Sequence, residues 1–155
     1  MSRPRATVVG VGNAYRCDDG VGPALVAHLA QDPPPGAVLE VCDGEPARLL
    51  DIWSRADLAV VVDSLVCSAP RPGRIHRTMV GDLHPAAGGG THSLGIPGAI
   101  ELASALGRAP ARFVVFAVEV AEVGHGLGLS PEVEAALPEL ERLVRAEISA
   151  EPALP

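Results

Sequence analysis

The sequence predicts an α/β fold, a three-layer α/β/α sandwich around a mostly parallel, twisted sheet of about five strands. Short runs rich in Val, Leu and Ile alternate along the chain with segments whose apolar residues recur at helical spacing. The run at 58–62 is apolar at every position, which is typical of a central strand covered on both faces. The 155 residues hold no internal repeat, linker or low-complexity segment, so we expect a single domain over 1–155.

The first third of the chain is predicted to fold as strand, helix and strand. Residues 6–11 are apolar and β-branched and lead into Gly12, which indicates a buried strand followed by a tight turn. A helix is expected from about 20 to 30, because an apolar residue recurs at every fourth position from Val21 and a proline run follows. Residues 38–42 are predicted to form a short second strand.

The middle third is predicted to contain a helix and two strands. Residues 46–54 have helical periodicity, with Pro46 in the first turn, where proline is tolerated. The apolar run 58–62 forms the third strand and ends at Asp63. A weaker strand is expected at 73–79.

The last third is predicted to hold two helices on either side of a strand. A flexible, glycine-rich loop at 88–93 leads into a helix over 93–106. The strand 111–120 follows. Ser130-Pro-Glu132 opens the final helix with a capping residue and a proline at the first position, and Pro138 is expected to kink or restart it.

Composition and charge exclude several kinds of function. The formal net charge is −7 and all 12 basic residues are arginine, so the chain lacks both the basic surface of a nucleic-acid binder and a catalytic lysine. The 3 cysteines match no CxxC or zinc-ribbon spacing, which favours reduced thiols. We find neither a signal peptide nor an apolar stretch of membrane-spanning length. We therefore expect a cytoplasmic monomer without membrane insertion.

The glycine-rich turn after the first strand has two interpretations. Gly10-x-Gly12 is similar to a dinucleotide fingerprint, and Asp43 stands where a ribose-binding acid would lie. The third glycine position holds Tyr15, however, and Asp18-Asp19 occupy the place where a pyrophosphate would approach. Two carboxylates there would repel phosphate. A nucleotide-binding oxidoreductase on a Rossmann-like sheet is therefore the alternative hypothesis.

Three residues could together bind a metal ion. Asp19 and Asp63 each follow a predicted strand, and the carboxyl ends of parallel strands share the edge of the sheet where ligands bind. His92 lies in the glycine-rich loop expected at the same edge. Two carboxylates and an imidazole suit a borderline divalent ion such as nickel or zinc. Each residue also has a simpler interpretation: a helix-capping acid, a turn-forming acid and a solvent-facing histidine.

The remaining candidates for chemistry have no evident partners in the sequence. Ser64, Ser93 and the cysteines lack a placed histidine–acid pair, so a nucleophilic triad is not supported. The four other histidines are interpreted as structural or solvent-facing: His28, His76, His84 and His125.

Six segments, taken in order, resemble the hydrogenase maturation proteases, the endopeptidases that remove a C-terminal extension from the [NiFe]-hydrogenase large subunit. Their order and spacing are specific, although each alone is common, and they extend over nearly the whole chain. Gly44-Glu-Pro46 and Pro138 depart from the family pattern only in local detail. The six segments are Val9-Gly-Val-Gly-Asn13, Asp18-Asp-Gly-Val-Gly22, Asp43-Gly44, Val60-Val-Val-Asp63, Thr91-His-Ser-Leu-Gly95 and Gly126-Leu-Gly-Leu-Ser-Pro131.

The resemblance implies a site and a partner. Position by position, the metal ligands of the family fall on Asp19, Asp63 and His92. The family also implies recognition of nickel already inserted into the hydrogenase large-subunit precursor, so that cleavage follows only after metal loading. Nickel would then be supplied by the substrate, and the free protein would be metal-free or hold a substitute divalent ion. Five further candidates would support the site or contact the substrate: Gly12, Asn13, Asp18, Asp43 and Gly90.

The mechanism implied by this resemblance contains two further hypotheses. No separate nucleophile is recognisable, which favours direct attack by water. The glycine-rich segment 88–90 is expected to move to admit the substrate tail. A third hypothesis about function is a metal-binding hydrogenase chaperone that holds the same precursor without cutting it.

Overall fold

The computed structural model describes residues 5–54, 56–79, 91–121 and 123–150, with 91–95 described by their backbone alone. At its centre is a five-stranded sheet in the order β2-β1-β3-β5-β4. β4 (Ile75–Met79) pairs antiparallel with β5 at one edge, and the other pairs are parallel. The predicted mostly parallel sheet is confirmed. The parallel strands are β1 (Ala6–Val11), β2 (Ala37–Cys42), β3 (Leu58–Leu65) and β5 (Arg112–Glu119).

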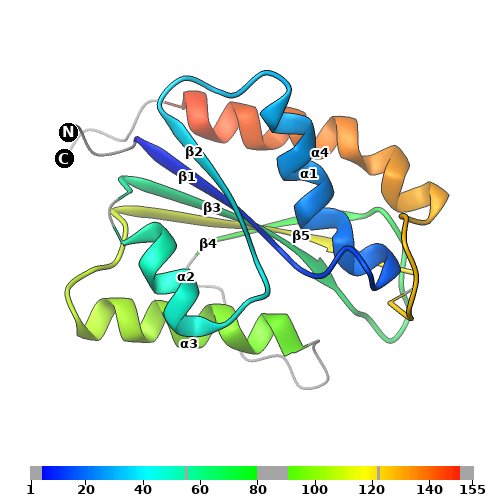
Figure 1. Cartoon of the computed structure of the whole chain (residues 1–155), viewed down its shortest axis with the longest axis horizontal. Coiled ribbons are helices and arrows are strands. Elements are labelled where there is room, and N and C mark those ends of the chain that lie inside the picture. The colour runs from blue at the N-terminus through cyan, green and yellow to red at the C-terminus, as the bar shows by residue number, and fades with distance from the viewer. Residues whose placement is uncertain (1–4, 55, 80–90, 122, 151–155) are drawn as a thin grey trace.

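Helices cover both faces of the sheet and make it the middle of three layers (Figure 1). α1 (Val21–Ala30) and α4 (Pro131–Ser149) lie on one face, and α2 (Pro46–Trp53) and α3 (Thr91–Ala105) lie on the other. A short 3₁₀ turn, η1 (Cys17–Gly20), precedes α1. In the part of the chain that the structure describes, no helix combines the length and apolar character that a membrane span requires.

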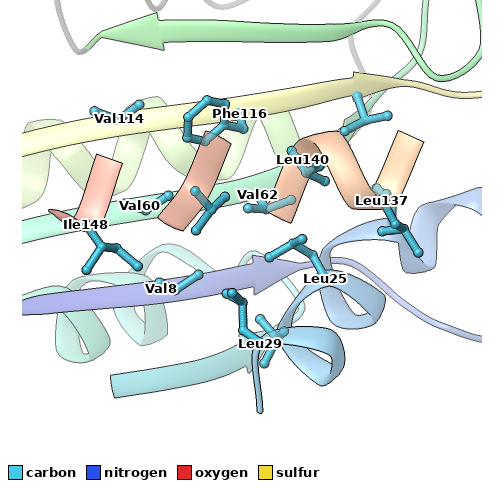
Figure 2. Packing of buried hydrophobic residues seen from close by; sticks show 14 of the residues in the cluster. Val8, Leu25, Leu29, Val60, Val62, Val114, Phe116, Leu137, Leu140 and Ile148 are labelled. Carbon is cyan, nitrogen blue, oxygen red and sulfur yellow. The ribbon is translucent and has the colours of Figure 1, made fainter. Parts of the chain in front are cut away.

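Successive residues of the central strands supply two separate apolar layers. Val62 of β3 belongs to a cluster with Leu25 of α1 and Leu140 of α4 (Figure 2). The preceding residue, Val61, points the other way and clusters with Trp53 of α2. This two-sided burial explains why β3 reads as a continuous apolar run, since neither face of the strand meets water.

Two glycines allow α1 to begin directly against the sheet. A Cβ atom on Gly22, in the first turn of α1, would lie 2.7 Å from backbone atoms of both Val11 and Val62. A Cβ atom on Gly10 of β1 would collide with the Gly22 carbonyl. A side chain at either position would therefore push the helix away from β1 and β3. The close approach brings η1, with its pair of aspartates, to the carboxyl ends of these two strands.

The predicted elements are present in the predicted order, most with ends shifted by one or two residues, and the differences in β3, α3 and α4 have a structural consequence. β3 continues through Asp63 to Leu65 because its pairing with β5 extends that far. α3 begins at Thr91, which places His92 in the first helical turn instead of a loop. α4 runs through Pro138 as one helix, so the expected restart is wrong. Pro138 is exposed, and water can bind the carbonyl that loses its intrahelical donor.

Candidate active site

The carboxyl ends of β1, β3 and β5 lie at one edge of the sheet, and α1 and α3 begin at the same edge (Figure 1). Two predicted site residues lie there, Asp19 in η1 and Asp63 near the end of β3. Each has only 3% of its surface exposed. Burying a carboxylate is unfavourable unless protein donors replace the hydrogen bonds that it made with water. The groups that donate hydrogen bonds to these two acids therefore determine how the site is built.

Asp19 is held by donors from two strands. Asn13 N, just after β1, donates to Asp19 Oδ2 (2.9 Å), and Ser64 Oγ of β3 donates to Asp19 Oδ1 (2.8 Å). Only a residue without a side chain fits at Gly12. Its φ is +142°, and a Cβ atom there would collide with the Asp19 carbonyl. Glycine is therefore required where the turn after β1 presses against η1.

Ser64 joins the two carboxylates. Its hydroxyl donates to Asp19, and its backbone N–H donates to Asp63 Oδ1 (2.8 Å). The sequence does not indicate this link, because Asp19 and Ser64 are 45 positions apart. The structure thus gives Ser64 an acidic partner, while no described histidine forms a hydrogen bond with it.

Asp18 connects the site to the rest of the fold. Its carboxylate is fully buried and accepts hydrogen bonds from Ala121 N (2.9 Å), Ser130 N (2.6 Å) and Ser130 Oγ (2.9 Å). Ser130 is the N-cap of α4, so Asp18 ties η1 to the end of β5 and to the start of α4. Gly20 is the N-cap of α1, so neither aspartate occupies the N-cap position of that helix.

Asn13 and Asp43 shape the turns on either side of this edge. Besides its N–H bond to Asp19, Asn13 accepts a hydrogen bond at Oδ1 from Tyr15 N (2.9 Å). Asp43 follows β2 and accepts from Glu45 N (3.1 Å) at the entry to α2. An open hollow of about 470 Å³ lies between Gly12 and this second turn.

His92 lies at the same edge, in the first turn of α3. Its side chain and the whole of Gly90 fall outside the described residues, as do segment 88–90 and His84, so their predicted roles stay predictions. Among the side chains that the structure describes, no three His, Cys, Asp or Glu groups form a metal cluster. Carboxylate oxygens and an imidazole are donors that a divalent-ion site can use, so metal binding by Asp19, Asp63 and His92 stays a prediction.

His76, interpreted from sequence as having no partner, contacts a buried acid. His76 Nε2 lies 2.7 Å from Glu119 Oε2 at the end of β5, and Arg71 N donates to Glu119 Oε1 (2.9 Å). The Arg71 and His76 hydrogen bonds lower the pKa of Glu119 to about 2. Burial, and then the Glu119 charge, raises the pKa of the Cys67 thiol. The cluster fastens the β3–β4 connection, and its protonated thiol is poorly suited to nucleophilic attack.

Three solved structures share this fold at 20–25% sequence identity. The hydrogenase maturating endopeptidase HybD from E. coli is 23% identical over 93% of this chain and 91% of its own, with a TM-score of 0.77. The [NiFe] hydrogenase maturation protease HybD from Thermococcus kodakarensis is 20% identical over 94% and 99%, with a TM-score of 0.75. A hydrogenase 2 maturation peptidase from Thaumarchaeota archaeon SCGC_AB-539-E09 is 25% identical over 95% and 99%, with a TM-score of 0.68.

A family model supplies the assignment that the fold alone does not. No curated protein matches this chain significantly. Residues 23–147 match the family HycI, described as hydrogenase maturation protease, and this span includes Asp63 and His92. The match extends over most of the 155 residues and includes four of the six sequence segments, while the first two segments, with Asp19, precede it. The chain belongs to the hydrogenase maturation protease family.

Proposed function

We propose that this protein is the endopeptidase that removes the C-terminal extension of a [NiFe]-hydrogenase large-subunit precursor after nickel insertion. Family membership supports a maturation protease. The observation that carries the finer proposal is the pair of buried carboxylates, Asp19 and Asp63, linked through Ser64 at the carboxyl edge of the sheet. Ligands of parallel α/β sheets bind at that edge.

In this proposal nickel belongs to the substrate. Asp19, Asp63 and His92 offer two carboxylates and an imidazole to nickel already held by the precursor, and the precursor supplies the other ligands. A precursor without nickel would form none of these bonds and would not be held for cleavage. Recognition of the metal would thus make processing conditional on metal insertion.

The proposed nucleophile is water. At the described site no histidine forms a hydrogen bond with Ser64, and the raised thiol pKa disfavours Cys67. Water would add to the scissile carbonyl carbon, and the C–N bond would then break as the departing amine takes up a proton. The charge of the carboxylate pair suits it to hold both the metal and the attacking water near the carbonyl.

The decisive experiment follows the C-terminus of a nickel-loaded precursor by mass spectrometry. Wild type is expected to release the C-terminal peptide, and to leave a nickel-free precursor whole. Asp19→Asn, Asp63→Asn and His92→Ala are each expected to slow release by more than about 100-fold, beyond the loss typical of residues that only support metal ligands. Asp51→Asn is the matched control, because the Asp51 side chain is 79% exposed on α2.

The outcomes separate the competing functions. Normal release by all three variants would refute the assigned site. A wild-type protein that binds the precursor but leaves its C-terminus intact would be the non-cleaving chaperone. The nucleotide-binding oxidoreductase is disfavoured because two buried carboxylates, Asp18 and Asp19, lie where a pyrophosphate would need donors. Titration with NAD(H) and NADP(H) is accordingly expected to show no binding.

A further inference from the structure

We propose that Ser64 is a positioning residue that sets the affinity of the Asp19–Asp63 pair for a divalent metal ion. This inference rests on the proposed function, since metal binding by the two aspartates is part of that proposal. Ser64 forms a hydrogen bond with each carboxylate, through its hydroxyl to Asp19 Oδ1 and through its backbone N–H to Asp63 Oδ1, both at 2.8 Å. One residue thereby fixes both acids relative to each other.

The hydroxyl bond completes the anchoring of Asp19. The backbone of η1 carries Asp19 just after Cys17, whose φ of 52° is unusual for a residue with a side chain. Asn13 N holds one carboxylate oxygen and Ser64 Oγ holds the other, so the carboxylate plane has a defined orientation. A carboxylate oxygen has two lone pairs, so accepting one hydrogen bond does not prevent it from binding a cation. Without the hydroxyl, Asp19 Oδ1 loses its hydrogen bond from Ser64, and the carboxylate is held less firmly against rotation about its last bond.

The two hydrogen bonds of Ser64 can be separated by mutation, because the bond to Asp63 does not involve the hydroxyl. That bond is donated by the Ser64 backbone N–H, which every residue except proline also provides, so Ser64→Ala and Ser64→Thr both keep this donor. A change in metal affinity on removing the hydroxyl can then be attributed to the anchoring of Asp19. The contact also suggests a rival role, because a carboxylate at 2.8 Å could accept the hydroxyl proton and make Ser64 a nucleophile.

The test measures the affinity of the full chain for Cd²⁺ by calorimetry. Ser64→Ala is expected to weaken binding at least about tenfold, the range for hydrogen-bond partners that orient metal ligands. Ser64→Thr keeps the hydroxyl on a residue suited to strands and is expected to stay within about threefold of wild type. Ser68→Ala, an exposed serine of the β3–β4 connection, is the matched control and should equal wild type. Asp63→Asn should abolish binding.

Thermal unfolding without metal and cleavage of the nickel-loaded precursor complete the set. Wild-type Cd²⁺ affinity in Ser64→Ala, whether or not its melting temperature falls, would refute the positioning role while the proposed function stands. Unchanged affinity combined with total loss of cleavage would instead assign Ser64 as the nucleophile. If Asp63→Asn binds Cd²⁺ like wild type, the assigned metal site is wrong and this inference fails with it. If wild type binds no Cd²⁺, this inference is overturned, while the proposed function stands because the precursor brings the metal and its other ligands.

Discussion

Asp18 and Asp19 are neighbours with identical side chains, and the structure gives them different tasks. The side chains of successive residues in a 3₁₀ turn point about 120° apart, so two neighbouring residues can contact different parts of the fold. Asp18 accepts hydrogen bonds from Ala121 and Ser130, at the start of α4, whereas Asp19 accepts from Asn13 and Ser64, at the ends of two strands. We interpret Asp18 as the residue that holds η1 in place and thereby positions Asp19 at the carboxyl edge of the sheet.

Replacing Asp18 should therefore cost stability. Asp18→Ala removes three hydrogen bonds to a buried carboxylate and leaves the N–H groups of Ala121 and Ser130 without their acceptor. The free energy of unfolding is expected to fall by about 3 kcal/mol or more, measured by urea denaturation. Asp51→Ala, on the exposed surface of α2, should change it by less than about 0.5 kcal/mol. Equal stability of the two variants would contradict this role for Asp18.

At this scale the sequence indicates acids more readily than their partners. Asp19 and Asp63 could be predicted because both follow strands, and parallel strands end at one edge. Ser64 could not be recognised as the link, since its contact with Asp19 spans 45 positions. The pairing of His76 with Glu119 likewise depends on the antiparallel register of β4 and β5, which alternating hydrophobicity does not encode.

At the scale of elements, the contact of α1 with the sheet decides where η1 lies. Gly22 gives the helix its close approach, because a Cβ atom there would meet backbone atoms, which cannot rotate away as a side chain can. Gly98 offers a contrast within α3: it is exposed, and a Cβ atom there would meet nothing within 4 Å. The two positions are thus a matched pair for the same substitution in a helix.

Alanine should have opposite effects at these two glycines. Gly22→Ala is expected to destabilise the fold by about 2 kcal/mol or more, since overpacking against a rigid neighbour forces the helix to move. Gly98→Ala should stabilise it by about 0.5–1 kcal/mol, because alanine restricts the unfolded chain and fits a helix without strain. Chemical denaturation of both variants provides the comparison. Destabilisation of similar size at both positions would show that close packing at Gly22 is not the cause.

The type and order of the helices and strands could be predicted because each segment has its own hydrophobic periodicity. The residues at which they end depend on the elements packed against them in space. β3 extends past Asp63 because β5 continues to pair with it as far as Glu119. α4 continues through Pro138 because Val133, Leu137 and Leu140 keep its inner face buried on both sides of the proline. Tertiary packing therefore outweighs the local tendency of proline to end a helix.

For the molecule as a whole, the sheet is shared between two apolar layers that do not touch directly. Val60 and Val62 of β3 face α1 and α4, while Val61 between them faces α2 and α3. The carboxyl edge belongs to both layers, since α1 begins there on one face and α3 on the other (Figure 1). The proposed site, with residues from η1, β3 and α3, would thus require both layers to be folded at the same time.

This arrangement predicts that a substitution that destabilises one apolar layer also lowers the stability of the other layer. Leu140 is fully buried between α4 and the sheet, and Leu140→Ala is expected to cost about 2–5 kcal/mol. Trp53 is the single tryptophan and lies fully buried in the opposite layer, edge-on to Phe113 at 5.0 Å, so its fluorescence reports that layer alone.

If 1–155 is one cooperative domain, the Trp53 transition in urea should shift by the full free energy lost in Leu140→Ala and coincide with the loss of circular dichroism. Leu106→Ala is the control, because Leu106 is exposed and its replacement should change the free energy of unfolding by less than about 0.5 kcal/mol. A Trp53 transition that stays at the wild-type midpoint while the circular dichroism shifts would mean that the two layers unfold separately. The carboxylate pair at their common edge could then be disrupted without complete unfolding.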